Sequence, residues 1–490
     1  MIITFGGLAL FFLLVVIYLQ VSYRKDRDFS DYAVAGRSFG AFFQSMSFLN
    51  TWFPGAIFIA FGGLAVTAGV ISFYLLMYSL LTIVMMYLIS NRVWLWGKKF
   101  NLYTQPDLFA LRYDSRNLRW LIGIIGMVSQ FPWIILGMQA LGMLFYYMAL
   151  RKIDFDIAVV MGVVLMIIRQ FWTVQMGIRG VVISDMLQGV VSYLGGSLLL
   201  LGLIGWLLLG QHATFTKLPN HLFELPGMGS KQGPLYVLSL IFTSALGGWC
   251  WPGIFVRLFT ANSVHAMKKA AAIAAPISFV FGAALMILAI LASSMPDVAK
   301  APSAVWFIVN QHAGGLVLLS IAGIIILAST MGNIDGNIQS TGSQIANDII
   351  GDFTKISEKH KVYIAKISIV VITLLGAWIA TIHVANLFNI AVIGYQGIIQ
   401  LAVPQFLGIF WTRGNRIGAY AGTITGFVLA VVLTLHYPEY VGPLWGATSG
   451  LVALIINFII YVACAYIFPH TPEEKQRVLT LFGMTKNTSA

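Results

Sequence analysis

Polar and ionisable side chains gather in one stretch, residues 324–348, that begins as an apolar run of membrane type. It reads IIILASTMGNIDGNIQSTGSQIAND and has Asp335 near its middle. Asp185 is the other acidic residue that we place inside a membrane segment. A charge in hydrocarbon costs about 2.5 kcal/mol or more, so such a residue indicates a functional site. The two carboxylates could hold one cation, or one carboxyl could accept a coupling proton.

Each acid also has a purely structural interpretation. Asp335 could satisfy a buried hydrogen bond between helices, and Asp185 could pair with Gln188 or Arg179 near the membrane interface. The residue types alone leave both interpretations open.

The composition is that of a helical membrane protein. Charged residues make up 9% of the 490 residues, and mean hydropathy is +0.87, whereas soluble domains carry about 25% charge. The net charge of +12 does not indicate nucleic-acid binding, because the basic residues sit in alternate loops. Cys250 and Cys464 lie in separate apolar segments and predict neither a disulfide framework nor a metal site. No pattern of catalytic residues indicates an enzyme.

Apolar runs predict thirteen membrane spans. The first is a retained helix, because no basic region precedes it and no small-residue cleavage site follows it. Residues 211–234 and 294–314 are expected to form long loops. The expected spans are 2–23, 43–69, 72–96, 118–149, 156–174, 181–209, 235–259, 270–294, 315–344, 363–386, 388–411, 417–435 and 443–468.

The distribution of basic residues predicts the orientation in the cell (inner) membrane. If the N-terminus lies outside, the cytoplasmic loops, the adjacent span ends and the tail 469–490 hold all but five of the 29 Lys and Arg. The C-terminus is then cytoplasmic. The five exceptions are Arg151, Lys152, Lys217, Lys231 and Lys300.

Two spans are interrupted at corresponding places. Pro54 and Gly55 interrupt the second span, and Pro252 and Gly253 interrupt the seventh. Broken backbone at membrane depth lines a cavity or is buried in protein, and matching breaks in two halves indicate a transporter's central site. We therefore expect two inverted repeats of five helices, and two unrelated kinks are the alternative. The predicted parts are the extra helix 2–23, the repeats 43–209 and 235–411, the final helices 417–468 and the tail.

Aromatic and amide side chains near the breaks are candidates for solute binding. Aromatic faces suit apolar bodies or cations, although membrane helices also use aromatic residues for packing. Little basic charge is expected at mid-membrane, so an anionic solute would depend on helix N-termini and polar side chains. The candidates are Thr51, Trp52, Gln130, Trp133, Gln139, Trp249 and Trp251.

Four motifs resemble those of the sodium–solute symporters, whose members include proline, pantothenate, sialic acid, monocarboxylate and sodium–glucose transporters. Asp31-Tyr32 with Ala35-Gly36-Arg37 is similar to the family's DYxxAGR, and residues 177–189, GIRGVVISDMLQG, are similar to its G-R-V-x-x-D-x-x-Q. Residues 323–348 resemble its GLILAAAMSTADS segment. Residues 408–413, GIFWTR, followed by Gly418-Ala419, resemble its GLFWKRxxxxGA. The resemblance covers about residues 28–468.

The resemblance implies a LeuT-like 5+5 inverted repeat with one helix before it and two after it. It also implies uptake of a small organic solute by alternating access, driven by Na⁺. Within the family, the resemblance favours the monocarboxylate and pantothenate branch.

The resemblance also implies where sodium would bind. One site would use carbonyls of Asn50 and Phe53 with side chains of the helix that carries Ser329 and Asn333. A second would use the acid that matches Asp185. The chain departs from the family at Gly332-Asn333, where a hydroxyl pair is usual, although Ser329 could restore a hydroxyl. A rebuilt sodium site, H⁺ coupling and uncoupled transport therefore all remain open.

A transporter-like solute sensor is the alternative function. Only about 20 residues follow the last expected helix, too few for a signalling domain. The sequence does not determine the solute or the oligomeric state.

Overall fold

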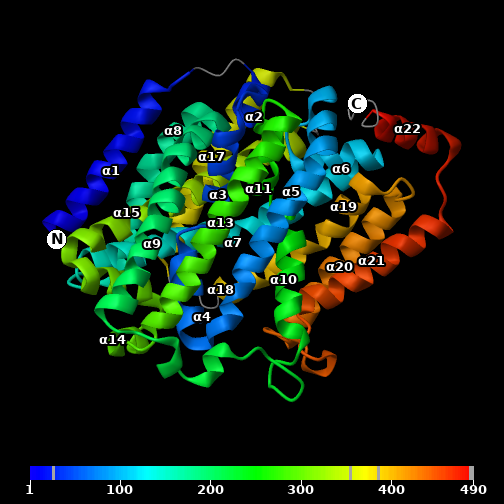
Figure 1. Ribbon diagram of the computed structural model, residues 1–490. Coiled ribbons are helices and arrows are strands. Elements are labelled where there is room, and N and C mark those ends of the chain that lie inside the picture. Colours follow the sequence, from blue (N-terminus) through cyan, green and yellow to red (C-terminus); the bar gives the residue numbers. More distant parts are fainter. Residues whose placement is uncertain (25–27, 352–355, 383–386, 485–490) are drawn as a thin grey trace.

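The protein is a bundle of helices (Figure 1); the computed structural model describes residues 1–24, 28–351, 356–382 and 387–484. Within those ranges no strand occurs, and extended backbone pairs only in the isolated bridges Phe39–Ala261 and Val441–Ala447. The predicted all-α membrane fold is confirmed. The end of the expected tenth span and Lys486 of the tail lie outside the described residues.

The first half of the chain contains the first broken helix. Helix α3 ends at Trp52 and α4 begins at Ala56, so the break falls on Pro54 and Gly55 as predicted. The elements are α1 (Ile2–Val21), α2 (Phe29–Val34), η1 (Ala35–Arg37), α3 (Ala41–Trp52), α4 (Ala56–Ala68), η2 (Gly69–Phe73), α5 (Tyr74–Lys99), α6 (Gln105–Tyr113), α7 (Arg116–Met148), α8 (Phe155–Gly189), η3 (Val190–Gly195), α9 (Gly196–Gly205) and η4 (Trp206–Gly210).

The second half contains the second broken helix. Leu235–Cys250 and Pro252–Thr260 meet at an angle of 63°, at the predicted Pro252. The elements are α10 (Leu235–Gly247), η7 (Gly248–Cys250), α11 (Pro252–Phe255), α12 (Arg257–Thr260), α13 (Val264–Ala292), α14 (Pro296–Lys300), η8 (Pro302–Ala304), α15 (Val305–Gln344), η9 (Ile345–Ile350), α17 (Glu358–Ala380), α18 (Leu387–Ile398), η10 (Ile399–Leu401) and α19 (Ala402–Phe410).

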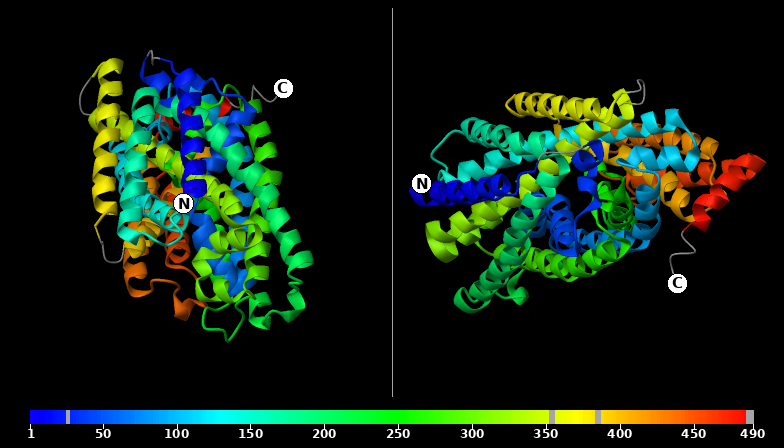
Figure 2. Two further views of the ribbon diagram at one scale, coloured as in Figure 1. Left: turned by 90° about the vertical axis from the view of Figure 1, so that its left-hand side faces the viewer. Right: turned by 90° about the horizontal axis from the view of Figure 1, so that it is seen from above.

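The two final apolar helices stand at the far side of the bundle from α1 (Figure 2). Helices α20 (Arg416–His436) and α21 (Ser449–Ile467) pack on each other and against α18 and α19. A short helix, α22 (Pro472–Gly483), follows them. Its Leu481 carbonyl accepts a hydrogen bond from the indole of Trp96 at 3.0 Å, which ties the tail to α5.

The expected count of thirteen spans is not confirmed. Ten helical segments of the described residues are long and apolar enough to cross a membrane, or eleven if the bent pair counts as one. One of the ten, Phe155–Gly210, has 56 residues, which as a straight helix would measure about 84 Å against a hydrocarbon core of about 30 Å. Gly177, with φ of 55°, interrupts it where the sequence predicts the boundary between the fifth and sixth spans.

The prediction of a loop over residues 294–314 is wrong for most of its length. Helix α14 and the first residues of α15 occupy it, and α15 reaches the membrane segment through a kink at Gly314 and Gly315. Polar and proline residues suggested a loop, but Trp306 is fully buried. Its indole donates to the Ala322 carbonyl at 3.1 Å, so tertiary packing holds the helix.

Two of the motifs that resemble the family interlock. Arg179, which follows the kink at Gly177, forms an ion pair with Asp31 and donates to the Ala35 carbonyl at 3.1 Å. A Cβ on Gly177 would lie 2.4 Å from the Tyr32 carbonyl oxygen, so only glycine fits there. These contacts fix α2 against α8.

Arg37 ties the same region to two more segments. It donates to the carbonyls of Gly97 at 2.8 Å, Leu102 at 2.6 Å and Phe259 at 3.0 Å. Burial lowers the pKa of Arg37 to about 10, which leaves it protonated at neutral pH.

The two ends of the bundle differ. Helices α2, α6 and α22 gather at one end, and α14 and the segment 211–234 lie at the other (Figure 1). The first end contains the segments to which the charge distribution assigns the cytoplasmic side.

Candidate functional site

Both broken helices pack against the same polar stretch of α15. A Cβ on Gly55 would lie 2.1 Å from Thr330 Oγ1, and a Cβ on Gly253 would lie 2.6 Å from Asn337 Oδ1. Because glycine has no Cβ, both breaks can approach α15 closely, at points two turns apart along that helix. The polar stretch 324–348 therefore contains the part of α15 that joins the two breaks.

The aromatic candidates divide into two groups, and the first group packs in the core. Trp52 stacks on Phe48, with ring centroids 5.9 Å apart, and its indole donates to Ser79 Oγ at 3.0 Å. Trp249 is fully buried; it also stacks on Phe48, and its indole donates to the Thr82 carbonyl at 2.9 Å. In this conformation the polar atoms of both indoles already have partners.

The second aromatic group includes a polar atom that has no hydrogen-bond partner among the described residues. Trp133 on α7 meets Trp251 edge to face, with ring centroids 6.2 Å apart, and Trp251 stacks on Tyr395. The buried Trp133 Nε1 has no hydrogen-bond partner among the described residues. The same holds for Ser129 Oγ, one turn away on α7, and for Thr51 Oγ1 on α3.

The two glutamine candidates form hydrogen bonds with other helices of the protein. Gln130 Nε2 donates to the Asn337 carbonyl at 2.7 Å and to Thr341 Oγ1 at 2.9 Å. Its Oε1 accepts from the backbone N–H of Gly253 at 3.4 Å, so it joins α7, α11 and α15. Gln139 Nε2 makes a long contact, 3.4 Å, with the Ala380 carbonyl.

Asp185 is fully buried in a set of donors from other helices. It accepts from Ser47 Oγ at 2.7 Å, Asn50 Nδ2 at 3.0 Å and Arg257 Nη2 at 3.2 Å. Gln188 reaches it only through Asn50, whose Nδ2 also donates to Gln188 Oε1 at 3.0 Å. The structural alternative that paired Asp185 with Arg179 is wrong, because Arg179 pairs with Asp31.

Asp335 has a separate cationic partner. Its carboxylate lies 2.7 Å from Arg169 Nη2 and accepts from Gln170 Nε2 at 2.6 Å. Arg169 also donates to Ser184 Oγ at 2.7 Å, and both charged side chains are fully buried. The helices that carry the two acids pack on each other, α15 against α8, but each carboxylate has an arginine partner of its own.

Two arginines that lie within expected spans are buried in the protein. Arg169 and Arg257 lie within expected spans and are 0% and 1% exposed. Each one neutralises an acid on another segment, which is how a buried charge is tolerated. Sequence reasoning counted them only toward the positive-inside balance; an acid and a base within apolar spans was the signal that could have revealed both pairs.

The other candidate cation ligands are also engaged in hydrogen bonds within the protein. The Phe53 carbonyl accepts from the Tyr193 hydroxyl at 2.6 Å, and Asn333 Nδ2 donates to the Thr51 carbonyl at 2.7 Å. The Ser329 hydroxyl donates within its own helix, to the carbonyls of Ile325 at 3.0 Å and Ile326 at 3.1 Å. A hard cation needs oxygen lone pairs directed at it, so this donor-rich arrangement does not fit a sodium ion.

The packing around residue 332 explains why a glycine stands there. A Cβ there would lie 1.8 Å from Asn50 Nδ2 and 2.6 Å from Asp185 Oδ1. The amide of Asn50 thus fills the space in which the family's usual hydroxyl would stand, and the departure at Gly332 accompanies it.

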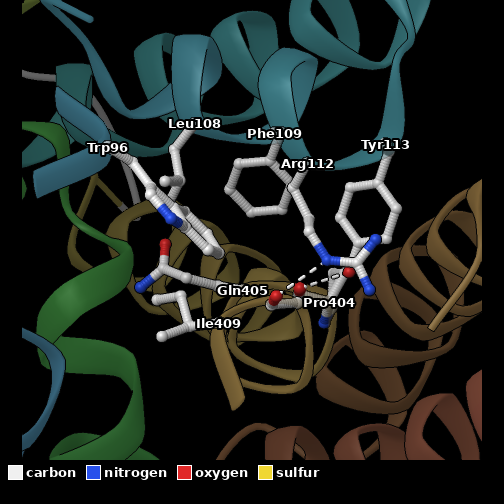
Figure 3. A pocket seen from close by; sticks show the side chains of 9 residues that line it. Trp96, Leu108, Phe109, Arg112, Tyr113, Pro404, Gln405 and Ile409 are labelled. Atoms are coloured by element: carbon white, nitrogen blue, oxygen red, sulfur yellow. Dashed lines mark hydrogen bonds between the residues drawn. The ribbon is translucent and has the colours of Figure 1, made fainter. Parts of the chain in front are cut away.

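The residues that the structure describes contain no cluster of three or more His, Cys, Asp or Glu that could hold a metal ion. A small cavity lies elsewhere, between α6 and α19 (Figure 3). Arg112 in its wall is buried and donates to carbonyls at the end of α19, at 2.8 Å to Gly408 and 3.0 Å to Trp411. Gln405 in the same wall donates to the Trp249 carbonyl at 2.9 Å, so the cavity adjoins the second broken helix.

The chain is similar to known symporters over most of its length. The model of the sodium:solute symporter family matches residues 32–426. An osmoregulated proline transporter, OpuE, of Bacillus subtilis is 22% identical over 470 residues, 87% of each chain. A sodium/proline symporter of Staphylococcus aureus is 22% identical and covers 95% of this chain and 92% of its own. An uncharacterized symporter of Bacillus subtilis, YhjB, is 24% identical over 92% of this chain and 94% of its own.

Solved structures have the same fold. A substrate-bound, outward-open Na⁺-coupled sialic acid symporter aligns with a TM-score of 0.75 at 20% identity, over 96% of this chain and 98% of its own. Mhp1, a nucleobase-cation-symport-1 family transporter, aligns with a TM-score of 0.57 at 15% identity, over 92% and 98%. The predicted LeuT-like fold is confirmed by these likenesses. The chain therefore belongs to the sodium:solute symporter family, and it is a secondary active transporter.

Proposed function

We propose that the protein carries a small organic solute across the cell membrane by alternating access, in symport with a cation. The observation that carries the proposal is the meeting of the two broken helices on the polar stretch of α15. Such breaks place unpaired backbone groups at the centre of a transporter, where solute and ion are held. Neither the described contacts nor the comparisons favour the sensor alternative.

The proposed solute site lies at Trp133, Trp251 and Tyr395. Their rings offer an apolar surface, and the Trp133 indole N–H and the Thr51 and Ser129 hydroxyls supply polar atoms without protein partners. A buried donor without a partner is costly, so a solute acceptor on the Trp133 N–H would stabilise the bound state. The solute class is therefore a small molecule with an apolar body and an acceptor group.

Uptake into proteoliposomes tests the function. The panel contains proline, which the names of two relatives suggest, together with pantothenate and small monocarboxylates. Inward sodium and proton gradients are imposed separately. Symport predicts concentrative uptake of at least one solute under at least one gradient. Bound solute without flux from either side would instead indicate a receptor.

Trp133→Phe tests the solute site. The ring remains but the N–H is lost, so the apparent affinity should weaken about 10-fold, in line with about 1.4 kcal/mol for one hydrogen bond. Trp378→Phe is the matched control, because Trp378 on α17 is 62% exposed on the outside of the bundle. Equal affinities for the two variants would place the solute elsewhere.

A further inference from the structure

We propose that Arg257 takes the place of the coupling cation at the junction of α3, α8, α11 and α15, so that Na⁺ does not bind there. The inference rests on the proposed function, since it concerns the coupling of transport. It differs from the family expectation of sodium beside the acid that matches Asp185, because Ser47, Asn50 and Arg257 all donate to that carboxylate.

Arg257 reaches the position through all three of its guanidinium nitrogens. Nη1 donates to the Gly253 carbonyl at 2.6 Å, Nη2 to Asp185 Oδ2 at 3.2 Å, and Nε to Ser47 Oγ at 3.2 Å. A Cβ on Gly336 of α15 would lie 2.7 Å from Nη2, so the guanidinium also rests against α15. One side chain therefore joins a carbonyl of the second break, a hydroxyl of the first broken helix and the buried acid, with α15 behind it.

The buried charges around Asp185 and Asp335 are balanced by arginines of the protein itself. Asp185 pairs with Arg257, and Asp335 pairs with Arg169, all four nearly or fully buried. Adding a sodium ion would create one uncompensated positive charge in a medium of low dielectric constant, which is strongly unfavourable. The carboxylate that could attract sodium is already neutralised.

The carbonyls of the first break are likewise supplied with donors. Asn333 must direct its amide nitrogen at the Thr51 carbonyl, because its amide oxygen would repel that acceptor. Asn50 must direct its nitrogen at Asp185 and Gln188 for the same reason. Asn50, Asn333 and Arg257 thus place N–H groups at the positions that the resemblance assigns to sodium.

The test measures sodium binding by the purified full-length protein without any solute. Binding of radioactive sodium and the shift of the melting temperature on replacing potassium chloride by sodium chloride at constant ionic strength are both recorded. The wild-type protein should show neither saturable binding nor a sodium-specific shift. Arg257→Gln exposes the charge of Asp185 and should gain both.

Two further variants keep the test decisive if Arg257→Gln folds poorly. The double variant Arg257→Gln/Asp185→Asn removes both charges and should again be indifferent to sodium. Arg112→Gln is the matched control, because Arg112 is an equally buried arginine whose described partners are carbonyls rather than an acid (Figure 3). It should not gain sodium binding.

Saturable, sodium-specific binding by the wild type that Asp185→Asn abolishes would overturn the proposal. A folded Arg257→Gln protein that stays indifferent to sodium would also overturn it. If Arg257→Gln does not fold in either salt, the wild-type measurement alone decides. Absence of solute uptake would count against the proposed function but would leave the ion measurement intact, so the two failures are distinguishable.

Discussion

At the scale of the residue, the contact between Gly332 and Asn50 is the most constrained feature of the site. Gly332→Ala would place a Cβ 1.8 Å from Asn50 Nδ2, and overpacking of this kind costs about 1–3 kcal/mol. We expect a clearly lower melting temperature for the purified variant. In an Asn50→Ala background the same substitution should cost less, because the clashing amide is gone and only the close approach to Asp185 Oδ1, at 2.6 Å, remains.

Gly202→Ala is the control, since no atom lies within 4 Å of the Cβ it would add. It should leave the melting temperature unchanged or raise it slightly, because glycine disfavours a helix by about 0.5–1 kcal/mol. Strict additivity of Gly332→Ala and Asn50→Ala would contradict the proposed contact, because residues in contact show interaction energies.

The sequence singles out the two buried acids as functional candidates but not the two arginines that pair with them. Asp185 and Asp335 stand out in a sequence because an acid among apolar residues is rare. Arg257 and Arg169 stand out equally, but each lies near an expected span end, where basic residues are normal. Only the packing of α8 against α15, and of α12 against α3, shows that Arg169 and Arg257 face inward.

At the scale of the element, the first break depends on Gly55. Gly55→Ala would put a Cβ 2.1 Å from Thr330 Oγ1 and 2.7 Å from the Ile326 carbonyl oxygen, so α4 would have to move away from α15. We expect strongly reduced uptake in proteoliposomes together with a lower melting temperature. Replacing Thr330 as well, in Gly55→Ala/Thr330→Ala, should restore activity only in part, because the backbone contact at Ile326 remains.

Gly6→Ala serves as the control for Gly55→Ala, since nothing lies within 4 Å of its added Cβ. Full uptake by Gly55→Ala would show that α4 and α15 do not need this close approach.

The breaks could be predicted because proline and glycine act locally, through a missing N–H and a missing Cβ. Helix α14 and the first part of α15 could not, because long-range contacts such as that of Trp306 with Ala322 stabilise them. Helix α6 begins with a capping box at Thr104 and Asp107, a local signal that could have revealed it within the expected loop.

At the scale of the whole molecule, composition and periodicity suffice for the fold class, but not for the number of spans. The bends at Gly177 and Gly315 do not interrupt the apolar character of Phe155–Gly210 and Pro302–Ile350. Judged by length and apolarity alone, each of these segments is one long helix. The sequence prediction instead divides Phe155–Gly210 into two membrane spans. The two breaks were predictable for a different reason: a proline followed by a glycine gives the same local signal in each half.

The orientation of the molecule is a prediction that chemical labelling tests. The basic loops assign α22 to the cytoplasm and the segment 211–234 to the outside, and the two lie at opposite ends of the bundle (Figure 1). Met228 and Leu479 are 81% and 55% exposed, so a cysteine at either position is reachable by a water-soluble maleimide.

In intact cells, Met228→Cys should react with a membrane-impermeant maleimide, and Leu479→Cys should react only after permeabilisation. Both substitutions are made together with Cys464→Ala, because Cys464 is half-buried while Cys250 is buried and unreactive. The Cys464→Ala protein alone should remain unlabelled. The reverse pattern would place the N-terminus in the cytoplasm. It would also mean that the basic residues do not govern the insertion of this chain.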